Sequence, residues 1–70
     1  MTADNYFVQL RQDWIAETLK VFGFIQRGHL ERKFNISTQQ ASFDIGKYID
    51  DHPGEIEYNA NTKRYERTKA

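Results

Sequence analysis

The sequence predicts a single, mainly α-helical domain of three helices with a small β-hairpin near its C-terminal end. Three observations predict it. Apolar residues recur with the helical period over residues 4–22 and 38–52. Residues 55–67 instead alternate around a turn-rich tetrapeptide, NANT, which is typical of a hairpin. Finally, a chain of 70 residues is long enough for one small core.

The first helix is expected over residues 4–22. Asp4 or Asn5 can cap it, because a short side-chain acceptor reaches the free amides of a first helical turn. Gly23 is the expected stop. One broad arc of the helix is apolar and is predicted to face the core: Phe7, Leu10, Trp14, Ile15, Leu19, Val21 and Phe22.

Arg11 falls inside this apolar arc, where a charge needs an explanation. We interpret it as a snorkelling side chain, with its stem on the apolar surface and its head in water. The alternative is an ion pair with a carboxylate elsewhere, such as Asp44.

Two short elements follow the first helix. Residues 24–27, FIQR, predict a brief strand, since they are too few for a helix. Residues 28–34 predict a short helix, in which Leu30 and Phe34 share a face. Asn35 suits the left-handed conformation that ends a helix.

The third helix has the clearest start. Ser37 and Gln40 have the spacing of a capping box, in which each side chain bonds the other residue's backbone amide. Pro53 biases the chain away from helix and marks the end. The expected buried stripe is Ala41, Ile45, Tyr48 and Ile49.

These elements together predict a winged helix-turn-helix: two helices joined by a tight turn, followed by a hairpin whose strands include residues 56–58 and 63–67. The strand at 24–27 is free to pair with the hairpin as a third strand.

Charge is separated along the chain although its formal total is zero. The balance is −1 over residues 1–22, +2 over 23–49, −4 over 50–61 and +3 over 62–70.

In a helix-turn-helix the second helix of the motif enters the major groove of double-stranded DNA. The face opposite the buried stripe carries Gln39, Gln40, Phe43 and Lys47, with Gly46 and Asp50 at its edge. Glutamine can pair with adenine, an aromatic ring can touch the thymine methyl, and lysine can meet guanine or a phosphate. We therefore predict that Gln39, Gln40, Phe43 and Lys47 contact bases, and that Phe43 is exposed because it faces a ligand.

Contacts to the DNA backbone are expected from the basic clusters and from the start of the third helix. Ser37 lies at a helix N-terminus, which favours a phosphate. Arg27 immediately precedes the predicted second helix, and His29, Arg32 and Lys33 lie within it. The wing supplies Lys63 and Arg64, then Arg67 and Lys69.

Residues 11–66 resemble the N-terminal winged helix of WYL-domain transcriptional regulators, and most closely the bacterial defence-island repressors. The shared motifs are G-x-I-x-R-x-x-L-x-x-x-F-x-I-S, then Q-A-S-x-D-I, then Y-x-x-x-x-P-G-x-I-x-Y-x-x-x-x-K-x-Y. The resemblance implies that Ser37, Thr38, Gln40, Ser42 and Phe43 face DNA. It also implies a homodimer on a palindromic operator, with repression released by a ligand on a separate domain.

The chain ends at Ala70, so we expect either the N-terminal domain of a longer regulator or a small regulator in its own right. As this chain alone, a monomer or weak dimer is expected. No cysteine, signal segment or membrane span is present in the sequence, and a cytoplasmic protein without cofactor or metal is predicted.

Enzymatic activity is not expected, because His29 and His52 belong to different elements and no nucleophile–base arrangement is visible. The rival hypothesis is a winged helix that binds another protein, with Phe43 as an anchor in the partner's pocket.

Overall fold

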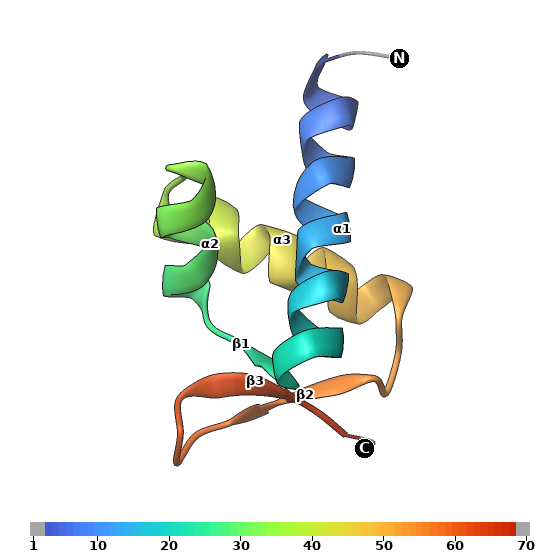
Figure 1. The fold of residues 1–70 in the computed structure, drawn as a ribbon, viewed down its shortest axis with the longest axis vertical. Coiled ribbons are helices and arrows are strands. Elements are labelled where there is room, and N and C mark those ends of the chain that lie inside the picture. The colour runs from blue at the N-terminus through green and yellow to red at the C-terminus, as the bar shows by residue number, and fades with distance from the viewer. Residues whose placement is uncertain (1–2, 69–70) are drawn as a thin grey trace.

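The predicted architecture is confirmed by the computed structural model, which describes residues 3–68 (Figure 1). Within these residues, three helices pack above one face of a small antiparallel sheet. The elements are α1 (Ala3–Phe22), β1 (Phe24–Ile25), α2 (Arg27–Phe34), α3 (Thr38–Asp51), β2 (Ile56–Asn59) and β3 (Arg64–Arg67). None of the described helices is long and apolar enough to cross a membrane.

The sheet has the strand order β1-β3-β2, so the short strand after α1 pairs with the hairpin as expected. Ile25 lies opposite Tyr65 in β3, and Tyr58 of β2 lies opposite the same tyrosine on the other side. The hairpin turn comes one residue later than the NANT tetrapeptide indicates. Lys63 therefore lies in the turn, with a positive φ of 58°, and not on the strand where the alternation placed it.

The core lies where the three helices meet the sheet. Its best-buried apolar side chains come from every helix and from two strands, so no pair of elements holds the fold alone. They are Ile15, Leu19, Ile25, Leu30, Ala41, Ile45, Tyr48 and Ile56.

The start of α1 differs from the sequence prediction. The helix begins at Ala3, so Asp4 and Asn5 lie inside it and neither is its N-cap. The predicted stop is correct: Gly23 has a φ of 82°, and its N–H donates to the carbonyl of Leu19 at 2.8 Å.

The apolar arc of α1 is only half covered. Ile15 and Leu19 are buried, whereas Phe7 is 52% and Leu10 is 41% exposed. The reason is visible in Figure 1, where the first turns of α1 extend beyond the rest of the fold and have no neighbour. Val21 and Phe22, at the other end of the helix, are also exposed.

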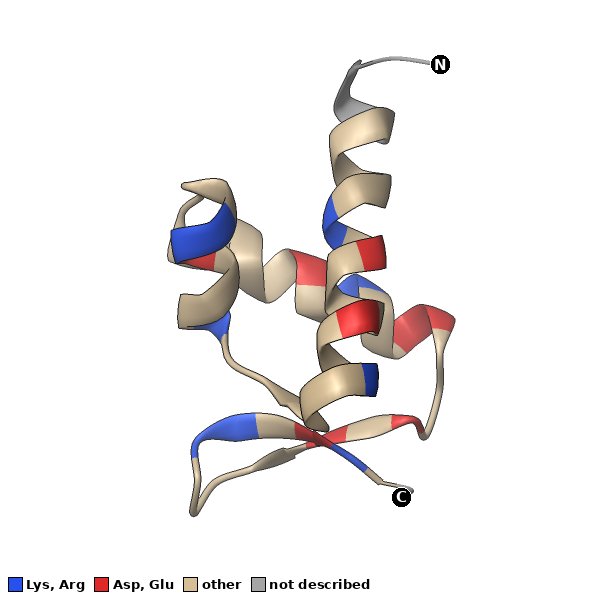
Figure 2. Cartoon of the chain, in the orientation of Figure 1, with Lys and Arg blue, Asp and Glu red and all other residues tan. Residues whose placement is uncertain are grey.

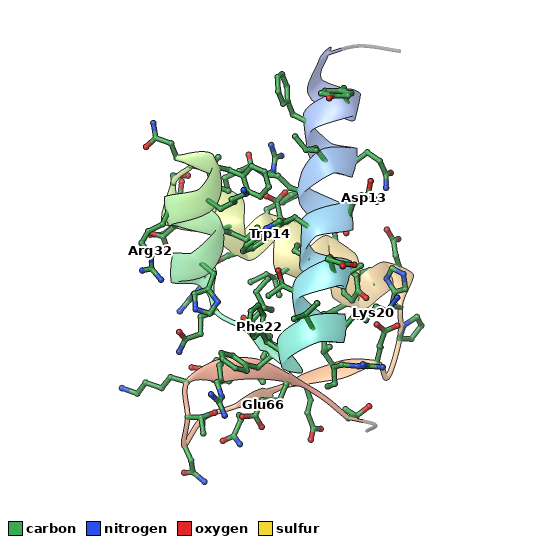
Figure 3. The ribbon with its side chains drawn as sticks, in the orientation of Figure 1. Asp13, Trp14, Lys20, Phe22, Arg32 and Glu66 are labelled. Atoms are coloured by element: carbon green, nitrogen blue, oxygen red, sulfur yellow. The ribbon has the colours of Figure 1, made fainter. Side chains whose placement is uncertain are left out.

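Trp14 lies at the boundary between the covered and uncovered parts of this arc. It points from α1 toward α2, whereas Asp13 and Lys20 lie on the other side of the helix (Figure 3). Its ring meets Phe34 edge to face, with 5.6 Å between ring centroids. Trp14 is thus a half-buried link between the two helices.

Candidate nucleic-acid interface

A three-residue turn, residues 35–37, sets the angle between α2 and α3. Asn35 takes the left-handed conformation, with φ 55° and ψ 49°, and so ends α2 as predicted. Ser37 caps α3, and its Oγ accepts the Gln40 N–H at 3.1 Å. The helix-turn-helix therefore rests on two local signals that the sequence displays directly.

The inward face of α3 is anchored to α1 by a buried carboxylate. Asp44 is fully buried, and Arg11 donates from Nε to its Oδ2 at 2.6 Å and from Nη2 to its Oδ1 at 3.4 Å. Gln12 donates its side-chain amide to the Asp44 backbone carbonyl at 2.8 Å. The snorkelling interpretation of Arg11 is therefore wrong, and the ion-pair alternative is confirmed.

Gln40 also bonds to the buried carboxylate of Asp44. Its side-chain Nε2 donates to Asp44 Oδ1 at 3.0 Å. Only the Ser37 half of the expected capping box forms, because the Gln40 amide is engaged with the buried carboxylate. In the free protein the end of this side chain lies on the α1 flank of α3, at the edge of the outward face.

The outward face of α3 presents three more of the predicted base-contacting residues, Gln39, Phe43 and Lys47. Phe43 is 69% exposed, and Gln39 is exposed on the same face. Lys47 is also exposed, and its Nζ lies 3.0 Å from Asp51 Oδ2 in an i,i+4 ion pair. Gly46 lies beside Phe43 in a shallow hollow of this face, which is lined by Phe43, Gly46, Lys47, Asp50 and Asp51.

The flank of α3 toward α2 carries Thr38 and Ser42. Ser42 Oγ accepts a hydrogen bond from Arg27 Nη1 at 3.3 Å. One predicted backbone-contacting residue and one predicted base-contacting residue are thus neighbours, at the start of α2 and on the second turn of α3. Thr38 is exposed at the N-terminal end of α3.

Two of the cations predicted for the wing, Lys63 and Arg64, lie in different environments. Lys63 is exposed in the turn. Arg64 is half-buried: its Nε lies 2.9 Å from Glu66 Oε2, and its guanidinium lies over the Phe24 ring at 4.1 Å from the centroid. The Arg64 hydrogen bond is the main cause that lowers the pKa of Glu66. Lys69 lies outside the described residues.

The charges of the fold are sorted in space. In Figure 2, Lys and Arg mark α2 and the turn end of β3, whereas Asp and Glu mark the C-terminal end of α3 and the start of β2. The acidic group comprises Asp50, Asp51, Glu55 and Glu57. The cations of α2 and of the turn end of β3 therefore lie apart from the acidic C-terminal end of α3.

His29 has a structural role at the start of α2. Burial, and then the nearby Arg32 charge, lower the pKa of His29 below its ordinary value of 6.5. Its Nδ1 accepts the Gln26 N–H at 3.3 Å, which satisfies a backbone group at the start of α2. This role of His29 was not predicted, although the three-residue spacing from Gln26 to His29 is that of a capping pair.

Comparison with known proteins agrees with this geometry. The family model described as the BrxR transcriptional regulator winged helix-turn-helix domain matches residues 4–70. No curated protein matches the chain.

Proposed function

Because the chain belongs to the family of BrxR transcriptional regulator winged helix-turn-helix domains, we propose that it binds double-stranded DNA sequence-specifically through α3 and represses transcription there. The family is one of transcriptional regulators and not of enzymes. Repression is the outcome that binding alone can produce, since a protein seated on a promoter excludes others from the same DNA.

The proposal rests on one observation, the set of side chains that the outward face of α3 exposes. It exposes 69% of Phe43, the most exposed of the large apolar side chains in the described chain. Around it lie Gln39 and Lys47, and no carboxylate points outward before Asp50. This combination of amide, aromatic and cationic groups matches the acceptors, donors and methyl groups that base pairs display in the major groove.

The roles of the other residues follow from their position around this face. Thr38 and Ser42 read or approach bases from the α2 flank, and Gln40 does so from the α1 flank if DNA draws its amide away from Asp44. The backbone contacts are Ser37 with the free amides of α3, Arg27 at the start of α2, and Lys63 and Arg64 on the wing.

A single winged helix covers one half-site, so two copies on a palindromic operator account for full specificity. The isolated domain then binds its half-site weakly. We expect it to sediment as a monomer or weak dimer in the absence of DNA, and a tight dimer at low micromolar concentration would contradict this.

The proposal is tested by selecting duplexes from a random pool with the wild-type domain. The selected and scrambled duplexes are then titrated at several salt concentrations. We expect a clear preference for the selected duplex, and an affinity that falls linearly on a log–log plot against salt. Absence of any preference would refute sequence-specific binding.

A second candidate function is protein binding, and a specific observation favours it. Tyr6, Phe7 and Leu10 form an exposed apolar patch on the protruding end of α1, and Val21 and Phe22 are exposed farther along. A partner held by apolar contacts would dissociate little as salt rises, unlike DNA. The same salt titration therefore separates the two functions.

A further inference from the structure

Gly46 stands in the middle of α3, a helix of 14 residues. Glycine is a poor residue at such a position, because it loses more backbone freedom on folding than any other residue. Alanine at this position would make the helix more stable. Some requirement therefore has to account for the missing side chain.

The fold itself does not supply this requirement. A Cβ built on Gly46 would meet nothing within 4 Å, so no internal packing excludes a side chain. Its backbone is ordinary, whereas Gly23 and Gly54 have the positive φ values of 82° and 79° that favour glycine. In α2, a Cβ on Gly28 would lie 3.2 Å from Arg32 Nη1, the end of a flexible side chain.

The surroundings of Gly46 point to an external partner. It forms part of the hollow on the outward face of α3, between the exposed ring of Phe43 and the carboxylate of Asp50. Because Gly46 has no side chain, the backbone of α3 is accessible to a ligand at this point. A ligand can approach α3 more closely here than a Cβ would allow.

We propose that Gly46 is the point of closest approach between α3 and the edge of a base pair in the major groove, an inference that rests on the proposed DNA binding. The charges of the hollow disfavour a phosphate at this point. Asp50 and Asp51 line the same hollow, and carboxylates repel phosphates. The ring of Phe43 offers the apolar contact that a thymine methyl takes.

The test is Gly46→Ala, whose effects on folding and on binding have opposite signs. The melting temperature should rise by roughly 2 to 8 °C, because alanine is the better helix former and the added methyl meets nothing. Affinity for the selected duplex should fall at least about tenfold, while affinity for scrambled duplex stays the same. Gly46→Leu, which adds a larger side chain, should lose more affinity for the selected duplex than Gly46→Ala. No purely structural role of Gly46 gives this pair of results.

Gly28→Ala is the matched control, since it also replaces a helical glycine but on α2. It should leave preference for the selected duplex unchanged. If wild type shows no preference for any duplex, the proposed function fails, and this inference with it. If wild type is selective and Gly46→Ala binds equally well, only the inference is overturned. An equal loss on selected and scrambled duplex would overturn the base-edge assignment.

Discussion

The inward and outward faces of α3 reverse the usual arrangement of a surface helix. The inward face buries a carboxylate, Asp44, with none of its surface exposed, whereas the outward face leaves Phe43 69% exposed. Charged residues are rarely buried without a partner, and a large exposed aromatic next to a hollow is a feature of binding surfaces. The buried carboxylate needs a partner within the fold, and for the exposed ring we propose a partner outside it.

The difference lies in where that partner is. Asp44 finds Arg11, Gln12 and Gln40 within the chain, and the polar groups around it fix α3 against α1. Among the described residues, no comparable set of contacts covers Phe43. The inward face thus fixes the position of the helix, and we propose the outward face for recognition. This division predicts that changes on the two faces affect different measurements.

The largest effect is expected on the inward face. Arg11→Ala leaves a buried carboxylate without its cation and should lower the free energy of unfolding by about 3 to 5 kcal/mol. Urea denaturation followed by Trp14 fluorescence measures it. Lys47→Ala is the control, because it breaks the exposed Lys47–Asp51 pair and should change stability by less than about 1 kcal/mol. Equal losses in the two variants would contradict the anchoring role of Arg11.

On the outward face, Phe43→Ala should leave stability within about 0.5 kcal/mol of wild type, since the ring packs on little. It should cost roughly 1 to 3 kcal/mol of binding to the selected duplex, with binding to scrambled duplex unchanged. Phe7→Ala removes another exposed phenylalanine, 52% exposed on α1, and should change neither quantity. If Phe43→Ala and Phe7→Ala both bind DNA with wild-type affinity, the result supports the protein-binding hypothesis.

A smaller effect is expected at the wing, which we propose contacts the DNA backbone and not the bases. Arg64→Gln should weaken binding to every duplex alike and should reduce the log–log salt slope by about one unit. Lys20→Gln, on the side of α1 opposite α2 (Figure 3), is the control and should leave the slope unchanged. A sequence-dependent loss in Arg64→Gln would place this arginine at a base instead.

The last effect concerns Tyr48 on the inward face, and it is confined to alkaline pH, outside the range in which the other variants are compared. Burial is the first cause that raises the pKa of Tyr48 to about 12, and the hydrogen bond to Glu55 acts in the same direction. The native state therefore keeps a proton that the unfolded chain releases near its ordinary value of 10. Stability should fall between about pH 10 and 12. Tyr48→Phe should remove this part of the fall, and identical pH profiles would contradict the assignment.

The helix-turn-helix was predictable because its signals are local. Asn35 and Ser37 act on the backbone groups beside them, and Pro53 acts on the residue before it. The exposed position of Phe43 was also predictable, since the helical period places it opposite Ala41, Ile45 and Tyr48.

The rest depends on tertiary contacts that no local pattern contains. Periodicity identified the apolar arc of α1 but not how far the neighbouring helices cover it, so Phe7 and Leu10 were wrongly placed in the core. Gln40 had two possible partners: the Ser37 backbone N–H, from which its side-chain oxygen would accept, and the Asp44 carboxylate, to which its Nε2 donates in a charge-assisted hydrogen bond. The base and backbone contacts themselves stay predictions.

The central claim is that Phe43 touches a base in the major groove, and a double-mutant cycle tests it most directly. Each thymine of the selected duplex is replaced in turn by uracil, which lacks only the methyl group, and each duplex is titrated with wild type and with Phe43→Ala. At one position the wild type should lose about fourfold in affinity, near 0.8 kcal/mol for one buried methyl, while Phe43→Ala loses nothing. Equal losses for both proteins at every thymine would contradict the claim.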